Sequence, residues 1–148
     1  MSTDVNKVLA GAMRLLAARE HSQHELRRKL AQKGHAVDAI EQVIEQLANQ
    51  GLQSDERFVE DFVKSHRDRG KGPKRIRLEL QGHHLPHELI EKHINERHAD
   101  WRDLALKVKL KKFGQAPIDD LKERSRQTRF LEYRGFTHDQ IAAVLGDE

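Results

Sequence analysis

The apolar residues of this chain recur every three or four positions rather than every second position, which predicts helices almost throughout. One apolar stripe covers residues 5–16 and another covers residues 37–47. Between them, Ser22 and Glu25 have the spacing of a capping box, in which the serine hydroxyl and the glutamate each bond a backbone N–H at the start of a helix. A short helix is therefore predicted to begin near residue 24, so the first 50 or so residues read as three helices.

The same helical pattern returns twice along the chain at a spacing of about 50 residues. The matched positions are Leu30, Gly34, Ile40 and Ile44 in the first copy, Leu80, His84, Ile90 and Ile94 in the second, and Leu131, Gly135, Ile141 and Leu145 in the third. We therefore predict an all-α fold, a tandem array of three three-helix repeats at residues 1–53, 54–100 and 101–148. Because one small repeat buries too little surface to be stable alone, neighbouring repeats should share faces in an elongated and curved row.

Helix start and stop signals fall at matching places in the repeats. Ser54 precedes two acidic residues, which is typical of a helix N-terminus. A glycine break at residues 70–72 leads to Pro73, whose missing N–H costs nothing at the first position of a helix. Thr137 and Gln140 form a second capping box. Gly34 is suited to the left-handed conformation that ends a helix.

Composition narrows the class of protein. Charged residues make up 34% of the chain and hydrophobic residues 36%, so a folded protein with a thin core is expected. The absence of cysteine excludes disulfides and thiolate chemistry. No apolar run reaches the ~18 residues of a membrane span, and residues 1–7 lack the apolar stretch of a signal peptide. We expect a cytoplasmic monomer without membrane contact.

Basic residues are clustered although the net charge is only +3. Seven of them fall between Phe62 and Leu78, and a second cluster covers residues 107–112. Such clusters favour contact with a polyanion or with an acidic protein surface, although each could equally be a solvated helix face. The residues predicted to bind a partner or DNA are Arg27, Arg28, Lys74, Arg75, Arg77, Lys107, Lys111, Lys112, Arg126, Arg129 and Arg134.

Catalytic chemistry has little support in the sequence. His83, His84 and His87 are the densest candidates for metal ligands, but Pro86 disfavours a helix there, so a polar turn between helices is the preferred interpretation. The Gly70-Lys71-Gly72 stretch is too short for a phosphate-binding loop. The chain is therefore predicted to be no enzyme and to need no cofactor or metal. The aromatic residues mostly lie on the apolar stripes and are predicted to be core.

Three stretches of the chain together form a recognisable pattern. They are residues 55–63 (DERFVEDFV) followed by Gly70, Gly72, Pro73, Ile76 and Leu80; residues 16–30 (LAAREHSQHELRRKL); and residues 129–136 (RFLEYRGF). These stretches resemble the bacterial RecX family. They span nearly the whole chain in the family's order. The second repeat departs from the pattern by having His84 where the other two repeats have glycine.

The resemblance implies tandem three-helix repeats and a regulatory role. A member of this family binds the RecA protein and its DNA filament, lies in the filament groove, and inhibits ATP hydrolysis, strand exchange and filament growth in homologous recombination, DNA repair and the SOS response. Weak binding of single- or double-stranded DNA is also implied. The alternative is a helical regulator that binds duplex DNA directly through the basic middle helices, against which the acidic third helices argue.

Overall fold

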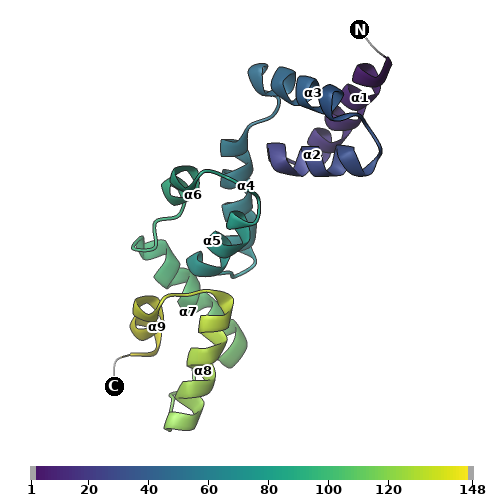
Figure 1. Cartoon of the computed structure of the whole chain (residues 1–148). Coiled ribbons are helices and arrows are strands. Elements are labelled where there is room, and N and C mark those ends of the chain that lie inside the picture. The colour runs from purple at the N-terminus through teal and green to yellow at the C-terminus, as the bar shows by residue number, and fades with distance from the viewer. Residues whose placement is uncertain (1–2, 147–148) are drawn as a thin grey trace. The chain divides into compact units, whose positions relative to one another are not determined.

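The computed structural model describes residues 3–146, which form nine helices and no strand (Figure 1). The prediction of an all-α fold is therefore confirmed. The chain divides into two compact units: unit 1 comprises the residues up to Asp61 together with His83–Leu85, and unit 2 comprises Phe62–Gly82 and the residues from Pro86 onward. None of the described helices is long and apolar enough to cross a membrane. Two expectations stay predictions: the repeat boundaries at 53/54 and 100/101, and the elongated, curved row. Residues 1–2 of the first repeat and residues 147–148 of the third lie outside the described residues.

Unit 1 is built on helices α1 (Thr3–Ala18), α2 (Gln23–Gln32) and α3 (Val37–Asn49), which lie together as a bundle in Figure 1. Their apolar stripes meet in one core. The fully enclosed side chains of this core include Val8, Leu26, Leu30, Val43 and Leu47. The predicted capping box at the start of α2 is confirmed, because the Glu25 N–H donates to Ser22 Oγ and the Ser22 N–H donates to Glu25 Oε1.

A buried polar network joins α2 to the rest of unit 1. Glu25 is almost fully enclosed and accepts a hydrogen bond at 2.7 Å from Arg19 Nη2. Burial by itself would raise the pKa of Glu25, but the hydrogen bonds from Arg19 and from the Ser22 backbone hold the pKa below its usual value. His21 lies beside this pair, with its Nε2 2.9 Å from Lys29 Nζ, and Gln53 Nε2 donates to the His21 carbonyl. The network satisfies polar groups that would otherwise be costly to bury.

Helix α4 (Asp55–Asp68) contains the boundary between the two units, and α5 (Pro73–Gln81) and α6 (His87–His93) follow it. Ser54 Oγ accepts from the Arg57 N–H, so the predicted cap at the start of α4 is confirmed. Pro73 occupies the first turn of α5 as predicted. Residues 83–86 are not helical, as Pro86 predicts, and α6 begins directly after the proline.

Unit 2 is completed by helices α7 (Ala99–Phe113), α8 (Leu121–Arg134) and α9 (His138–Leu145). Ala105, Leu131, Phe136 and Ile141 form the buried core among them. Thr137 and Gln140 make both hydrogen bonds of the predicted capping box at the start of α9. Tyr133, by contrast, is 71% exposed, so the prediction that the aromatic residues are core is wrong at this position.

The end of α8 meets the start of α5 backbone to backbone. The Gly72 N–H donates to the Arg134 carbonyl at 2.7 Å, and the Lys74 N–H donates to the Gly135 carbonyl at 2.9 Å. N–H groups at the start of α5, which have no partner within their own helix, thus bond carbonyl groups at the end of α8 that also lack one. A Cβ on Gly72 would lie 2.4 Å from the Gly135 carbonyl carbon, so only glycine allows this approach.

The glycine position shared by the repeats keeps its conformation even where glycine is replaced. Gly34 and Gly135 have φ values of +86° and +104°, and His84 at the matching position of the second repeat has φ +55°. Histidine is one of the residues that tolerate this left-handed region. Helix α5 ends at Gln81, and the chain turns through residues 82–84 before α6. The departure at His84 therefore leaves the register of the repeat intact.

Candidate functional site

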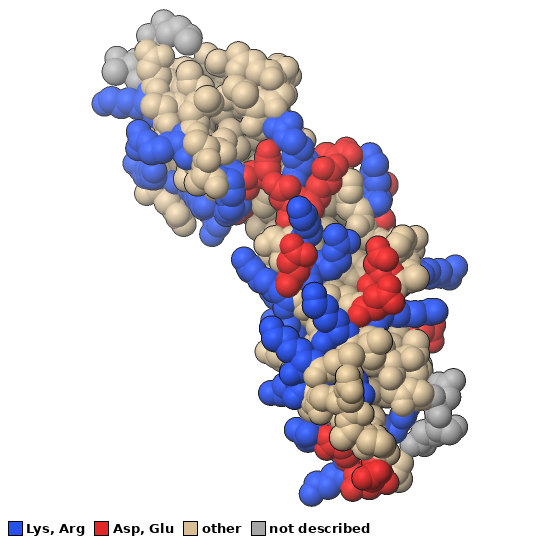
Figure 2. Space-filling model, turned by 180° about the vertical axis from the view of Figure 1, so that it is seen from behind, with Lys and Arg blue, Asp and Glu red and all other residues tan. Residues whose placement is uncertain are grey.

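A groove in unit 2 brings together four of the predicted partner-binding residues. Its walls come from the C-terminal end of α4, the face of α7 and the last turns of α8. Six cationic side chains line it: Arg67, Arg69, Lys107, Lys111, Lys112 and Arg134. Figure 2 shows Lys and Arg side chains gathered along one edge of unit 2, with Asp and Glu among them. The groove is our candidate functional site, and we call it the basic groove.

The floor of the basic groove is apolar. Leu104, Val108 and Phe130 line it between the charged side chains. Phe130 packs edge-on against Phe113 with the ring centroids 5.3 Å apart. Lys112 Nζ lies 5.6 Å from the centre of the Phe130 ring, within the range of a cation–π contact. The groove thus combines cations with an apolar surface.

Arg134 is fixed at one wall of the basic groove. Its Nη2 donates to the Arg69 carbonyl at 2.6 Å, and its Nε donates to the Gly70 carbonyl at 3.3 Å. These carbonyls follow the end of α4, where a positive charge is favourable. Gly70 has φ +81°, a conformation that favours glycine, and a Cβ there would lie 2.7 Å from Arg134 Nη2, so a larger residue would displace the guanidinium from its present position. Arg134 is consequently a structural residue as well as a member of the groove.

Two of the predicted cations on α5 are engaged within unit 2. Arg75 Nη1 donates to the Tyr133 carbonyl, and the Arg75 guanidinium lies 4.9 Å from the centre of the Tyr133 ring. Arg77 pairs with Glu91 at 2.7 Å and also with Glu96. Burial would lower the pKa of Arg77, but these two carboxylates hold it above its usual value. Lys74, the third predicted residue on this helix, is exposed.

The remaining predicted residues are not brought into the basic groove. Arg27 pairs with Glu41 at 2.7 Å and Arg28 is exposed, both in unit 1. Arg126 pairs with Glu123 on α8 at 2.7 Å and lies over Phe113, while Arg129 is exposed on the same helix. Exposed ion pairs of this kind contribute about 0–1 kcal/mol, so they leave the cations available to a partner at small cost.

Arg67 and Arg69 belong to the basic groove although they were not among the predicted partner-binding residues. Both lie in the basic stretch from Phe62 to Leu78, so the sequence contained a signal for them. That signal could not separate these two residues from Arg75 and Arg77 on the next helix. The separation depends on which helix faces α7, and that is a property of the tertiary structure.

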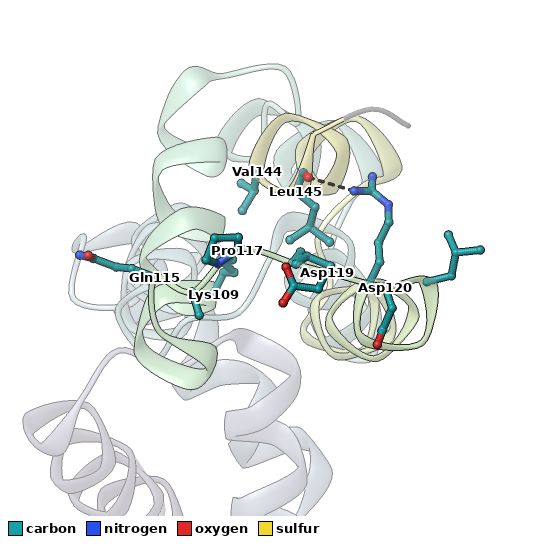
Figure 3. Close-up of a pocket in the computed structure, with 11 residues that line it drawn as sticks. Lys109, Gln115, Pro117, Asp119, Asp120, Val144 and Leu145 are labelled. Atoms are coloured by element: carbon teal, nitrogen blue, oxygen red, sulfur yellow. Dashed lines mark hydrogen bonds between the residues drawn. The ribbon is translucent and has the colours of Figure 1, made fainter.

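A second hollow of unit 2 lies between the connection 114–120 and helix α9 (Figure 3). Arg124 donates to the carbonyl of Leu145 at 2.9 Å across it and also bonds the Gly146 carbonyl. Asp120, at its rim, accepts from the Glu123 N–H as the cap of α8. These polar contacts stabilise the end of α9 and the start of α8, so we assign the polar residues of this hollow a structural role.

The histidines considered as metal ligands lie in a polar turn. The His83 ring lies 5.0 Å from the Phe58 ring, and burial lowers the pKa of His83. His84 stacks on His24 with the ring centroids 3.9 Å apart. His87 is exposed in the first turn of α6. His83 and His84 thus contact different rings, and residues 83–86 lie between helices as the predicted turn.

Comparison with known proteins gives three matches in tandem. Residues 10–47 match the first RecX three-helix domain, residues 54–94 match the second, and residues 100–145 match the third. The regulatory protein RecX of Halorhodospira halophila (strain DSM 244 / SL1) is 42% identical over 139 residues, which cover 93% of this chain and 86% of that protein. The chain belongs to the RecX family. The regulatory protein RecX of Pseudomonas putida (strain GB-1) is 44% identical over 135 residues, 90% of this chain and 86% of the relative.

A solved RecX structure shares the fold. The crystal structure of RecX from Lactobacillus salivarius matches with a TM-score of 0.82 at 19% identity, covering 98% of this chain and 96% of that chain. The predicted RecX resemblance and the predicted three three-helix domains in tandem are thus confirmed. The RecX relatives are regulatory proteins by name, which agrees with the prediction that this chain is not an enzyme.

Proposed function

We propose that this chain binds the RecA protein and its DNA filament and restrains ATP hydrolysis, strand exchange and filament growth. The observation that supports this function is the match to all three RecX three-helix domains in order, with relatives above 40% identity over about nine-tenths of the chain. The proposed site of action is cytoplasmic, where the recombinase works, and the active form is a monomer.

The mechanism follows from linked contacts rather than from catalysis. Each three-helix domain contributes one weak contact, and a second contact made by the same chain is intramolecular, so its effective concentration is high. RecA protomers must shift relative to one another during turnover or filament growth. A ligand that binds one arrangement of protomers more tightly than another stabilises that arrangement by the difference in affinity. This mechanism uses no catalytic residue and no cofactor.

Charged side chains carry the proposed contact. Lys107 and Lys111 are exposed one turn apart on α7, and both lie in the basic groove. Arg75, Arg77 and Arg134 also hold unit 2 together, so their replacement would confound folding with binding. Lys107 and Lys111 are therefore the better positions for a test.

The double variant Lys107→Glu/Lys111→Glu is expected to bind RecA–DNA filaments at least tenfold more weakly and to lose most of its inhibition of the RecA ATPase. Its helicity should be unchanged, because surface substitutions away from special contacts usually alter stability by less than about 0.5 kcal/mol. Co-sedimentation with filaments and an ATPase titration measure the two effects, and circular dichroism checks the fold.

The matched control is Lys7→Glu/Arg14→Glu, which reverses two exposed cations of α1 and changes the net charge equally. Failure of the parent chain to sediment with filaments would reject the proposed function. Equal losses in both double variants would assign the effect to net charge instead of to the basic groove.

Direct binding of duplex DNA is the second candidate function, and the exposed cations Lys74 and Arg129, which lie on the middle helices α5 and α8 outside the basic groove, favour it. A protein that neutralises several phosphates loses affinity steeply as salt rises, because counterions are released on binding. If this function holds, the parent should bind free duplex without RecA, with an affinity that falls between about 50 and 200 mM salt, and Lys74→Glu/Arg129→Glu should weaken that binding.

A further inference from the structure

The charge of the basic groove changes sign along its α7 wall. Along α7, Asp100, Asp103, Lys107 and Lys111 all line the groove. Residues three and four apart on a helix lie above one another on the same face, so the two carboxylates occupy one end and the two ammonium groups occupy the other. Asp68 adds a third carboxylate to the lining. The α7 wall of the groove is therefore acidic toward its N-terminal end and basic toward its C-terminal end, while on the opposite wall Asp68 lies between Arg67 and Arg69 in the sequence.

A continuous phosphate chain fits this charge pattern poorly. Nucleic acid carries a negative charge on every nucleotide, so a strand lying along the groove would bring phosphates against Asp100 and Asp103. Like charges brought together in this way oppose binding. A polypeptide can place acidic residues at the lysine end and neutral or basic residues at the aspartate end, and so avoids the repulsion.

The floor of the groove also favours a polypeptide. Leu104 and Val108 are aliphatic and offer no ring on which a base could stack, whereas they suit the side chains of Leu, Ile or Val. Phe130 is the one aromatic residue in the lining, and its ring already contacts Phe113, Lys112 and Arg134. A nucleobase would have to displace these contacts in order to stack there.

The basic end is partly preorganised. Arg134 is held by its two hydrogen bonds to the backbone after α4, and Lys112 is drawn toward the Phe130 ring. Side chains that are already ordered lose less conformational entropy when a partner binds. Cations fixed beside an apolar floor match an amphipathic acidic segment, in which apolar and acidic positions alternate around one short element.

We propose that the basic groove of unit 2 binds an amphipathic acidic segment of a partner protein. Aliphatic side chains of the segment pack on Leu104 and Val108, and its carboxylates pair with Lys107 and Lys111. This inference rests on the proposed function, since the segment belongs to the protein that the chain regulates. It goes further by naming the chemistry of the contact and by excluding phosphates from this groove.

Three synthetic peptides of about 15 residues test the chemistry. The first has Leu at positions i, i+3, i+4 and i+7 with Glu at most other positions; the second replaces Leu by Ser; the third replaces Glu by Lys. Fluorescence anisotropy with the full chain should show the first peptide binding at least tenfold more tightly than either of the others. Unlabelled 15-nucleotide single strands and 15-base-pair duplexes should fail to displace it.

Protein variants then locate the peptide. Lys107→Glu/Lys111→Glu should weaken binding of the first peptide at least tenfold, whereas Lys7→Glu/Arg14→Glu should leave it unchanged. The inference is overturned if the serine peptide binds as well as the leucine peptide, if either oligonucleotide displaces the peptide, or if the Lys107 and Lys111 reversals have no effect on it.

Filament co-sedimentation separates this inference from the proposed function. A chain that sediments with RecA–DNA filaments but does not bind the acidic leucine peptide overturns the groove inference and leaves the proposed function standing. A chain that binds the peptide but not the filaments overturns the proposed function and supports the chemistry of the groove.

Discussion

Replacing Gly135 with alanine is expected to lower the free energy of unfolding by about 3 kcal/mol or more, the sum of two costs. Gly135 has φ +104°, a conformation in which a Cβ costs about 1–2 kcal/mol. The added Cβ would also lie 2.4 Å from Arg75 Cβ and 2.6 Å from the Arg75 backbone nitrogen. Because the obstructing atoms belong to the backbone and Cβ of α5, they cannot rotate away, and the junction of α8 with α5 must open.

Two further alanine variants separate the two costs. Gly34 occupies the same position of the first repeat with φ +86°, and an added Cβ would meet no atom within 4 Å, so Gly34→Ala should lower the free energy of unfolding only through backbone strain. Gly72 has an ordinary φ of −83°, so Gly72→Ala should lower it only through the overlap of the Cβ with the Gly135 carbonyl group.

Thermal and denaturant unfolding, followed by circular dichroism, measures all three variants. Gly135→Ala should be the most destabilised, and Gly34→Ala should lose only about 1 kcal/mol. Equal losses in Gly135→Ala and Gly34→Ala would contradict the backbone contact between α8 and α5. Gly82→Ala, at φ −71° with its nearest atom 3.4 Å from the added Cβ, serves as the control for inserting a methyl group at a helix end.

Glu25→Ala is expected to destabilise unit 1 by about 2 kcal/mol. Glu25 is 4% exposed and receives hydrogen bonds from Arg19 and from the Ser22 backbone, so its removal breaks the capping box and leaves the buried Ser22 N–H and the Arg19 guanidinium without a carboxylate. Arg19 is about half exposed, which keeps the cost below that of a fully buried pair. Glu25→Gln keeps the shape and one acceptor and should lose less.

The same network predicts how stability changes with pH. The pKa of Glu25 lies below the usual 4.5, so the stability it contributes is complete above pH 4.5 and is lost as the pH falls through its lowered pKa. The pKa of His21 is lowered from 6.5, first by burial and then by the charges of Arg19 and Lys29. The unfolded chain therefore binds the His21 proton more readily than the folded chain, and stability also declines as the pH falls below 6.5.

Unfolding midpoints at pH 7.5, 5.5 and 3.5 check this expectation. The parent should lose stability in both intervals. Glu25→Gln should lose less than the parent between pH 5.5 and 3.5, because its amide does not titrate. If the unfolding midpoint of Glu25→Gln falls by as much as that of the parent over this interval, the Glu25 carboxylate does not stabilise the fold.

The local sequence determined where helices begin and end. The Ser22 and Thr137 capping boxes, the Ser54 cap and Pro73 at the start of α5 act through residues a few positions away, so their effect is readable without a tertiary structure. The spacing of Leu30, Leu80 and Leu131 likewise revealed the repeat, because each buries the same face of a middle helix.

Only the tertiary structure decided which cations could form a site. Sequence clustering grouped Arg75 and Arg77 with Lys107 and Lys111 as partner-binding residues. In the folded chain the first two are engaged by Tyr133, Glu91 and Glu96, whereas the two lysines are exposed in the basic groove with Arg67 and Arg69. The charge of a residue can be read from the sequence. Whether that charge must first break an ion pair or a hydrogen bond in order to bind a partner depends on neighbours that are distant in sequence. The reason why Gly72 and Gly135 must be glycine is of the same kind, since the atoms that exclude a side chain lie more than 50 residues away.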